Sequence, residues 1–352
     1  MGNRSLDANV VNLIAVYPKV LQILNGEIPL PEVVELFLTN YCNFACPHCR
    51  CATHHGDATQ FLDVEVLYRL LQELDAKGVK TIELGGGGEP LEHPEIEKIL
   101  RWFRDQRFRV GIITNGYRFT SQPELFDLLM DCGDWVRFSL DAVSDDTYRI
   151  VHGRSDLSYS VLRSVIVDAL RRVRRKPSVD HRPKVGIKLI VQEANEHQVL
   201  TAVDEAVDLG VDYLQFKWLE DHPRSIPQAR RATLATDLSR RIRDLSANSV
   251  FVDVLPGYGG SRVHSRCIMS VLHPVIDWDG AVYMCAFFHH RKEKHAIGNV
   301  ARERFFNCWG SPLHRERIGQ VEPEQCVANC PLLRYNPVIE FIRQEGFRFR
   351  YI

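Results

Sequence analysis

The sequence has 352 residues, of which 45% are hydrophobic and 25% charged, so the chain is long enough to bury a full-sized core and does not have a disordered composition. The formal net charge of -1 gives no overall field that would attract nucleic acid or an anionic membrane surface. No apolar run approaches the roughly 18 residues that a membrane span needs, and we therefore expect a cytoplasmic protein.

Apolar, β-branched runs alternate with segments of helical periodicity over most of the chain. The runs are almost entirely hydrophobic, which is typical of parallel strands that are buried on both faces. We expect strands at 33–39, 81–84, 110–114, 135–140, 185–191 and 213–218, and helices at 63–76, 94–106, 123–132, 158–175, 196–209 and 226–245. Six strand-helix units with right-handed crossovers predict an α/β fold, namely a partial (β/α)6 barrel that resembles an incomplete TIM barrel.

The alternation ends after Ser249, and a different pattern follows. Residues 271–276 and 281–284 are expected to form a hairpin around an Asp-Gly turn at 279–280. This change predicts a small C-terminal α+β domain over residues 249–352. The barrel is expected over residues 31–248, and residues 1–30 are expected to form a helical extension.

Unusual residues follow the end of each of the first four expected strands. A cysteine-rich segment follows the first strand, and segments 85–90, 115–116 and 139–141 follow the next three. In a barrel, the carboxyl ends of parallel strands lie on one face, where such barrels carry their active sites. We therefore expect these four segments to surround a single site.

The ten cysteines point to metal ligation or catalysis rather than to disulfides, because a cytoplasmic compartment keeps thiols reduced. Cys42, Cys46 and Cys49 lie together on the loop after the first strand. Three thiolates can hold a [4Fe-4S] cluster in which one iron stays open to a small ligand. A zinc site is the alternative on spacing alone, with Cys51 or one of two nearby histidines as the fourth ligand.

The spacing Cys42-x3-Cys46-x2-Cys49, with the aromatic His48 before the last cysteine, resembles the signature of the radical S-adenosylmethionine (SAM) superfamily. Three further segments are similar to motifs of that family and occur in the same order: Gly-Gly-Glu-Pro at 87–90, Thr-Asn-Gly at 114–116 and Ser-Leu-Asp at 139–141. The resemblance implies that the open iron binds SAM and that an electron from the cluster cleaves it. The resulting 5′-deoxyadenosyl radical then abstracts a substrate hydrogen atom.

The same resemblance implies which residues contact SAM. Gly87 and Gly88 let the backbone approach the methionyl amine because they lack Cβ, and Glu89 or nearby carbonyls accept hydrogen bonds from it. Phe44 and His48 flank the adenine, although a phenylalanine beside cysteines is as often simple packing. The full expected set is Phe44, His48, Gly87, Gly88, Glu89, Asn115, Ser139 (toward a ribose hydroxyl) and Asp141.

A second set of four cysteines lies late in the chain, at Cys267, Cys285, Cys326 and Cys330. Four thiolates can close a cluster completely, and a zinc ribbon is again the alternative. The Gly280-x4-Cys285 turn and segments 297–300 and 309–312 resemble the SPASM/twitch extension of radical SAM enzymes, which carries auxiliary iron-sulfur clusters. Because only four cysteines remain in register, as in the shorter twitch form, the resemblance implies one auxiliary [4Fe-4S] cluster.

Three further residues are candidates for catalysis. Cys308 lies between the two halves of the auxiliary site, and in radical SAM epimerases such a cysteine returns a hydrogen atom to the substrate radical. An inert buried thiol is the alternative. Lys217 and Glu220 stand where the sixth strand opens onto the expected catalytic face, where they would bind or deprotonate a polar substrate.

The resemblance to compact twitch enzymes implies oxidation or epimerisation of a small molecule, a sugar or aminocyclitol in antibiotic biosynthesis, with flavodoxin or ferredoxin as the reducing partner. The first alternative is a radical SAM maturase that epimerises or crosslinks a ribosomal peptide. The remote alternative is a zinc-binding module without turnover. No nucleic acid or membrane partner is expected.

Overall fold

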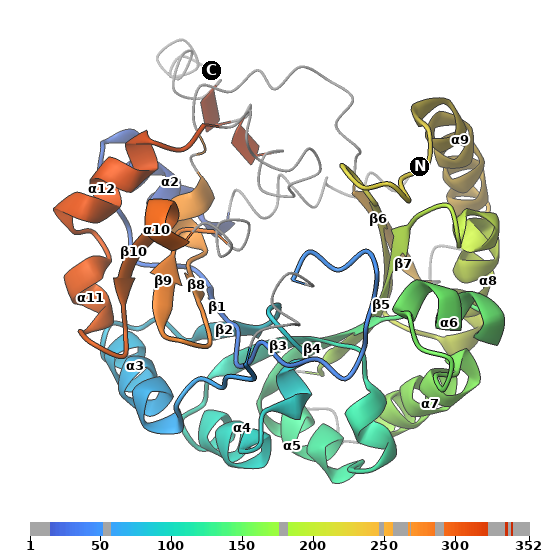
Figure 1. Ribbon diagram of the computed structural model, residues 1–352, viewed down its shortest axis with the longest axis horizontal. Helices are drawn as coiled ribbons and strands as arrows, with labels where there is room; N and C mark the ends of the chain where they lie inside the picture. The colour runs from blue at the N-terminus through green and yellow to red at the C-terminus, as the bar shows by residue number, and fades with distance from the viewer. Residues whose placement is uncertain are drawn as a thin grey trace, which may run out of the picture.

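The computed structural model describes residues 15–51, 58–175, 182–245, 250–255, 267, 269–285, 292–322, 335–336 and 339–340. Within these residues, ten strands form one curved sheet in the order β10-β9-β8-β1-β2-β3-β4-β5-β6-β7 (Figure 1). The strands are β1 (Val34–Leu36), β2 (Thr81–Leu84), β3 (Arg109–Thr114), β4 (Gly133–Ser139), β5 (Lys184–Val191), β6 (Tyr213–Trp218), β7 (Phe251–Leu255), β8 (Val275–Ile276), β9 (Ala281–Tyr283) and β10 (Ala296–Asn299). Strands β1 to β8 pair in parallel, and β9 and β10 pair antiparallel.

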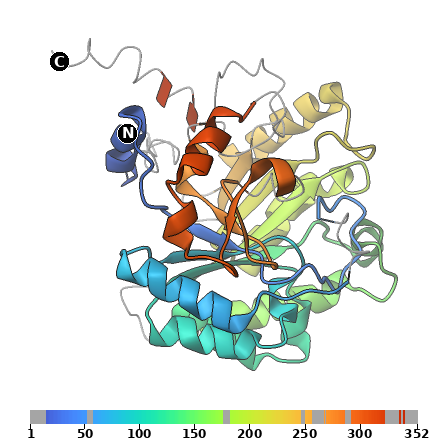
Figure 2. The same cartoon turned by 60° about the vertical axis from the view of Figure 1, so that its left-hand side comes forward.

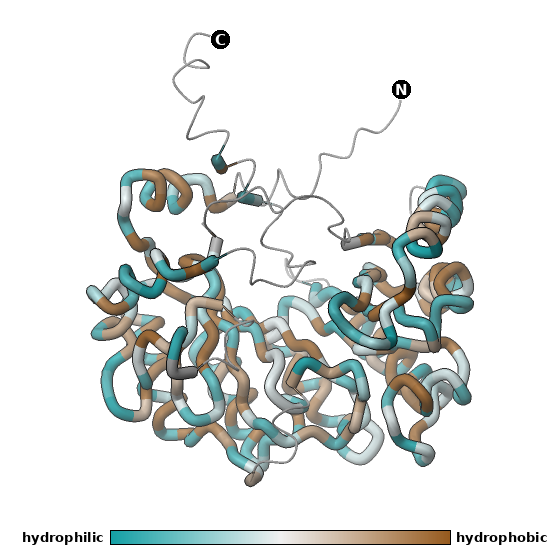
Figure 3. The backbone as a smooth tube through the Cα atoms, turned by 45° about the horizontal axis from the view of Figure 1, so that its top comes forward, coloured by the Kyte–Doolittle hydropathy of each residue, from teal (hydrophilic) through white to brown (hydrophobic). Residues whose placement is uncertain are grey.

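Helices α3 to α9 lie on the outer side of the curved sheet, and hydrophobic and hydrophilic residues alternate along them (Figures 1 and 3). The helices are α2 (Tyr17–Leu24), α3 (Val64–Ala76), α4 (Ile96–Asp105), α5 (Glu124–Cys132), α6 (Asp145–His152), α7 (Tyr159–Arg175), α8 (Val199–Leu209), α9 (Gln228–Arg243), α10 (Lys292–His295), α11 (Phe305–Cys308) and α12 (Pro312–Gly319). Short 3-10 turns are η2 (Pro90–Glu92), η3 (Tyr117–Thr120), η4 (Glu196–Gln198) and η5 (Met269–Leu272). Within the described ranges, no helix combines the length and apolarity that crossing a membrane requires.

Helix α3 shows how the local sequence sets these boundaries. The side chain of Asp63 accepts hydrogen bonds from the backbone N–H groups of Glu65 and Val66, which caps the first turn. Leu67, Leu71 and other apolar residues spaced three or four apart are buried against the sheet. Just beyond the helix, Gly78 has φ +78°, a left-handed conformation that glycine adopts without strain.

The two faces of the sheet differ sharply in polarity, because successive side chains of a strand point to opposite sides. On β4, Val136 and Phe138 are fully buried toward the helices. Between them, Arg137 donates through Nη1 to Oε1 of Gln215 on β6, at 3.3 Å. Gln215 in turn donates to Asp253 on β7, at 3.0 Å. The inner face of the barrel is therefore lined with polar and charged side chains.

Strand β8 joins the C-terminal part of the chain to the barrel. It pairs in parallel with β1, so that β8, β9 and β10 extend the barrel sheet. The indole of Trp309 donates to the carbonyl of Pro29, at 2.9 Å, and Arg315 donates to the carbonyl of Gly26, at 3.1 Å. These contacts bring α2 beside α12 (Figures 1 and 2).

The predicted alternation of strands and helices is confirmed over the first six strands, with ends that differ by a few residues. The prediction missed the seventh strand, β7, because it ended the alternation of strands and helices after Ser249. It also missed the two-turn helix α6, whose first residues are polar. The hairpin turn at 279–280 is confirmed, but β8 begins only at Val275, because 269–272 form a 3-10 turn.

Gly111 on β3 tests the packing of the inner face. A Cβ at this position would lie 2.1 Å from Cε2 of Trp135 on the neighbouring strand. We expect Gly111→Ala to lower the free energy of unfolding by about 1–3 kcal/mol, because the added methyl group would force the β3 backbone and the Trp135 ring apart. Gly319→Ala, at a position with no atom within 4 Å, is the matched control and should be neutral or slightly stabilising in the same urea titration.

Candidate active site

The cysteine loop that follows β1 is anchored at its base by hydrogen bonds to a distant segment. The hydroxyl of Thr39 donates to the carbonyl of Gln60, at 2.8 Å, and the side-chain amide of Asn40 donates to the carbonyl of Ala58, at 3.0 Å. The backbone N–H of Gln60 donates back to Asn40 Oδ1, at 2.8 Å. These bonds hold the loop at the carboxyl end of the barrel, beside β2.

The predicted motif residues converge on one cavity of about 270 Å³ at this end of the barrel. It is lined by residues at or just beyond the carboxyl ends of β1 to β6, and the strand-end argument predicted the contributions of the first four strands and of the sixth. The predicted site residues among its walls are Cys42, Phe44, Cys46, His48, Cys49, Gly88, Glu89, Asn115, Ser139, Asp141, Lys217 and Glu220. Gly87 is not among the lining residues.

The three cysteines of the loop fit an iron-sulfur cluster by their chemistry. Burial raises the pKa of the Cys42 thiol to about 12, with a further rise from the charge of Glu89, and burial also raises the pKa of Cys46. A buried thiolate is therefore costly unless a cation compensates it, which ligated iron does. Among the described residues, no group of three histidine, cysteine or carboxylate side chains lies close enough to hold a single metal ion.

The glycine-rich segment after β2 packs directly against the cysteine loop. Gly88 donates to the carbonyl of Thr39, at 2.6 Å, and Glu89 donates to the carbonyl of Tyr41, at 2.9 Å. A Cβ on Gly88 would lie 1.8 Å from the Tyr41 carbonyl oxygen, and a Cβ on Gly87 would lie 2.6 Å from that of Thr39. The missing Cβ atoms therefore let this segment approach the cysteine loop, while a direct contact with SAM stays a prediction.

Glu89 is buried and accepts hydrogen bonds from the two neighbouring segments. The hydroxyl of Thr114 donates to Oε1, at 2.6 Å, the backbone N–H of Asn115 donates to Oε2, at 2.8 Å, and Leu91 donates to Oε1, at 3.2 Å. Burial raises the pKa of this carboxyl to about 7, and the three hydrogen bonds only partly oppose that rise. Asn115 also donates to the side chain of Asn43 on the cysteine loop, at 2.6 Å.

His48 is held between two side chains at the carboxyl ends of β4 and β5. The amide of Gln192 lies 3.1 Å from Nδ1, and Oδ2 of Asp141 lies 3.7 Å from Nε2. Burial tends to raise the pKa of Asp141, but the hydrogen bond and the charge of His48 outweigh burial and lower it. Asp141 has φ +52°, and Asn195 donates to its carbonyl, at 2.7 Å. The sequence argument missed Gln192 and Asn195, although both follow the end of an expected strand.

His152, from the unpredicted helix α6, also lines the cavity. Its Nε2 donates to the carbonyl of Leu140, at 3.3 Å, and its Nδ1 lies 3.1 Å from the sulfur of Cys46. Burial lowers the pKa of His152 to about 4. Phe44 packs edge-on against this ring and against those of Tyr117 and Tyr148, so packing accounts for much of its burial.

The predicted catalytic residues fall in two places. Lys217 and Glu220 line the cavity, and Glu220 forms an ion pair with Arg231 on α9. Cys308 is buried between α11 and β10, where its sulfur donates to the carbonyl of Phe305, at 3.0 Å, and its Cβ lies 2.3 Å from where a Cβ on Gly298 would be. It is not one of the cavity-lining residues, and its role as a hydrogen donor stays a prediction.

The second cysteine set is described only in part. Cys267 and Cys285 are both buried, and Cys285 lies two residues beyond the end of β9. Cys326 and Cys330 lie outside the described residues. The assignment of these four cysteines to one auxiliary cluster therefore stays a prediction.

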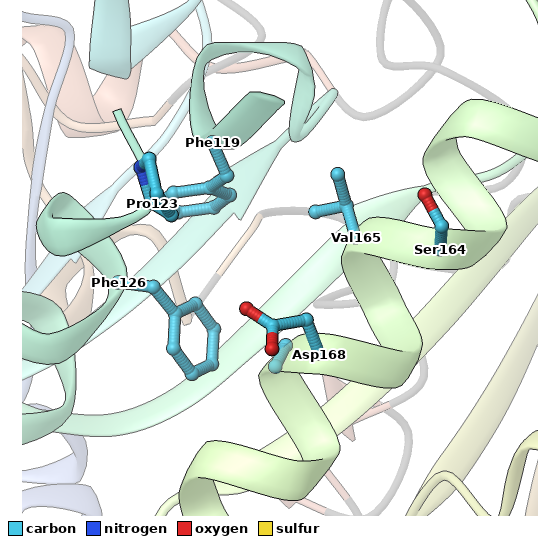
Figure 4. A pocket seen from close by; sticks show the side chains of 7 residues that line it. Phe119, Pro123, Phe126, Ser164, Val165 and Asp168 are labelled. Carbon is cyan, nitrogen blue, oxygen red and sulfur yellow. The ribbon is translucent and has the colours of Figure 1, made fainter. Parts of the chain in front are cut away.

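A second pocket, of about 140 Å³, lies between α5 and α7. Val165 and Asp168 point from α7 toward the rings of Phe119 and Phe126 (Figure 4). Asp168 accepts a hydrogen bond from Arg172, at 2.6 Å. No cysteine and none of the predicted site residues lines this pocket.

The model of the radical SAM superfamily matches residues 36–212, half of the chain. The chain belongs to the radical SAM superfamily. A second model, SPASM, described as an iron-sulfur cluster-binding domain, matches residues 267–331. The protein therefore uses SAM with two [4Fe-4S] clusters, one that binds SAM and one auxiliary, and the zinc-module alternative is excluded.

Two relatives and one solved structure illustrate the similarity. The subtilosin biosynthesis protein AlbA of Bacillus subtilis is 24% identical over 320 residues, which cover 88% of this chain and 67% of AlbA. The AdoMet-dependent heme synthase of Methanosarcina barkeri is 31% identical over 342 residues, 90% of this chain and 92% of the synthase. Streptococcus suis SuiB bound to its precursor peptide SuiA superimposes with a TM-score of 0.68 at 14% identity, covering 97% of this chain and 81% of SuiB, which shows a shared fold.

Removing Cys46 tests the ligand set. We expect Cys46→Ala to retain about half of the iron of the wild-type protein, because only the auxiliary cluster keeps its four thiolates. It should form no 5′-deoxyadenosine from SAM under reduction. Cys132→Ala is the control, since this thiol is buried at the end of α5 beside the Leu128 and Leu129 carbonyls, and should keep full iron content. Wild-type iron content in Cys46→Ala would contradict the assignment.

The raised pKa of Glu89 predicts a pH dependence. An ionised carboxylate would be the stronger acceptor for the methionyl amine of SAM, and the pKa of this carboxyl is about 7. The affinity for SAM should therefore increase as the pH rises from about 6 to about 8. Glu89→Gln should bind SAM about tenfold to a hundredfold more weakly, with no such rise, since a charge-assisted hydrogen bond is lost.

Exposed Glu97 on α4 supplies the control for this measurement. Its carboxylate pairs with Arg101 on the same helix surface, so Glu97→Gln should reproduce the wild-type affinity and pH profile. Equilibrium binding of SAM to the cluster-loaded protein measures all three. A wild-type profile that is flat between the two pH values would remove Glu89 as the acceptor.

Proposed function

We propose that this protein is a radical SAM maturase that removes a hydrogen atom from a C–H bond of a ribosomal peptide, leading to a crosslink or to epimerisation. The main support is the similarity to AlbA, a bacteriocin biosynthesis protein, over 88% of this chain. That similarity favours the peptide alternative over the sugar or aminocyclitol substrate that the twitch resemblance first suggested.

The size of the cavity supports a substrate that enters only in part. At about 270 Å³, the cavity is slightly smaller than the usual range of ligand pockets, roughly 300–1,000 Å³, and SAM must also bind there. A peptide can stay outside and insert one side chain. A tetrapyrrole, suggested by the 31% identity to a heme synthase, is the second candidate.

The residues of this chain have separate tasks in the proposed reaction. When bound, SAM and the reduced cluster would supply a 5′-deoxyadenosyl radical to take one hydrogen atom from the substrate. For a crosslink, the second hydrogen would leave as a proton and its electron would pass to the auxiliary cluster. Glu89, His48 and Asp141 orient SAM on the side of the cysteine loop. Lys217 and Glu220, at the end of β6, face the substrate side of the same cavity and hold polar groups of the peptide. A flavodoxin or ferredoxin delivers the electron.

The proposal is tested by incubating the cluster-loaded protein, reduced and supplied with SAM, with a short precursor peptide encoded beside its gene. We expect 5′-deoxyadenosine together with a peptide that has lost two hydrogens, for a crosslink, or has gained one deuterium in deuterated water, for epimerisation. The Cys46→Ala variant should give neither product. Turnover of a tetrapyrrole or of an aminocyclitol, with an unchanged peptide, would overturn the proposal.

In the epimerisation outcome, Cys308 can be tested directly as the hydrogen donor. Cys308→Ala would then still form 5′-deoxyadenosine but lose inversion of the peptide residue. An unchanged yield of the inverted product would leave Cys308 with the packing role that its burial beside Gly298 suggests.

A further inference from the structure

The loop between β6 and α9 connects the substrate side of the cavity to the cysteine loop. It begins with Leu219 and Glu220, which line the cavity. Its backbone is tied to the end of β5, because Leu219 donates to the carbonyl of Val191, at 2.9 Å, and Glu193 donates to that of Arg224, at 3.0 Å. Between these ties, the loop places His222 against the cysteine loop.

Both ring nitrogens of His222 are engaged, and the partners determine the tautomer. The backbone N–H of Arg224 lies 3.1 Å from Nδ1 and can only donate. The carbonyl of Pro47 lies 3.1 Å from Nε2 and can only accept. The proton of the neutral ring therefore sits on Nε2, and His222 donates across the barrel to the cysteine loop.

The carbonyl of Pro47, which accepts this hydrogen bond, lies between two of the predicted cluster ligands in the sequence. Pro47 follows Cys46 directly, and the peptide that carries this carbonyl leads to His48, one residue before Cys49. His48 is held from its other side by Gln192. The ends of β5 and β6 thus fix two adjacent residues that lie between two ligands of the SAM-binding cluster.

We propose that His222 is a positioning residue, which orients the Pro47–His48 peptide through its Nε2–H bond and so sets how SAM sits on the open iron. The inference concerns SAM binding alone, so it does not depend on the peptide substrate proposed above.

Two substitutions distinguish the hydrogen bond made by Nε2 of His222 from the one made by Nδ1. In His222→Gln, the side-chain amide nitrogen reaches about as far as Nε2 and can still donate to Pro47. In His222→Asn, the side-chain oxygen stands in place of Nδ1 and can still accept from Arg224, but nothing reaches Pro47. His197→Ala removes an exposed histidine of η4 and is the matched control.

The experiment titrates SAM into each reduced, cluster-loaded protein and follows the change that SAM causes in the EPR spectrum of the cluster. Iron content is measured first and should be the same in all four proteins. We expect His222→Gln and His197→Ala to match the wild type. His222→Asn should bind SAM about twofold to tenfold more weakly, the ratio that one net hydrogen bond gives, with an altered SAM-bound spectrum.

Every other pattern overturns the inference. Wild-type affinity and spectrum in His222→Asn would mean that the bond to Pro47 does not position SAM. Equal impairment of His222→Gln and His222→Asn would mean that the ring acts through packing or through Arg224 rather than through its Nε2–H donor. Loss of iron in His222→Asn alone would mean that the bond holds the cluster itself and not the cofactor.

Discussion

The site depends on one contact, the close approach of the glycine-rich segment after β2 to the cysteine loop after β1. Two backbone hydrogen bonds, from Gly88 and Glu89 to the carbonyls of Thr39 and Tyr41, join these segments. They require glycine, because a Cβ on Gly88 would overlap the Tyr41 carbonyl. The same pairing places the Glu89 carboxyl in the wall of the cavity, where it accepts hydrogen bonds from Thr114 and Asn115. Cluster loop, glycine segment and third strand are therefore positioned as one unit.

The barrel differs from an ordinary parallel core because charged groups occupy its inner face. Burial raises the pKa of Glu35 well above its usual value, and the nearby charge of Glu83 adds to the rise. Burial also lowers the pKa of Lys188, as do the neighbouring cations Arg137 and Lys217. Opposite charges on adjacent strands offset part of this cost. Charged side chains on the inner face of the barrel thus lie below the cavity, which suits a site that binds a charged cofactor.

Much of this arrangement could be predicted from the sequence. Strand periodicity and the strand-end rule located the cavity, because most of the motif residues after β1 to β4 line it, together with Lys217 and Glu220 at the end of β6. What could not be predicted depends on contacts between distant segments. Helix α6 was missed since its two turns begin with polar residues, and it supplies His152 to the cavity. The placement of Cys308 away from the cavity depends on the packing of α11 on β10, which no spacing rule encodes.

Strand β8 has a consequence for the redox chemistry. It gives β1 a hydrogen-bonded neighbour on the side opposite β2, and the chain reaches Cys285 just beyond β9, in the same sheet. The cysteine loop and Cys285 are thus attached to one continuous sheet. If Cys285 holds the auxiliary cluster as predicted, backbone pairing would constrain the separation over which an electron passes between the two clusters. Cutting the chain before β8 would leave β1 as an open sheet edge, so neither half can be studied in isolation without disturbing the other.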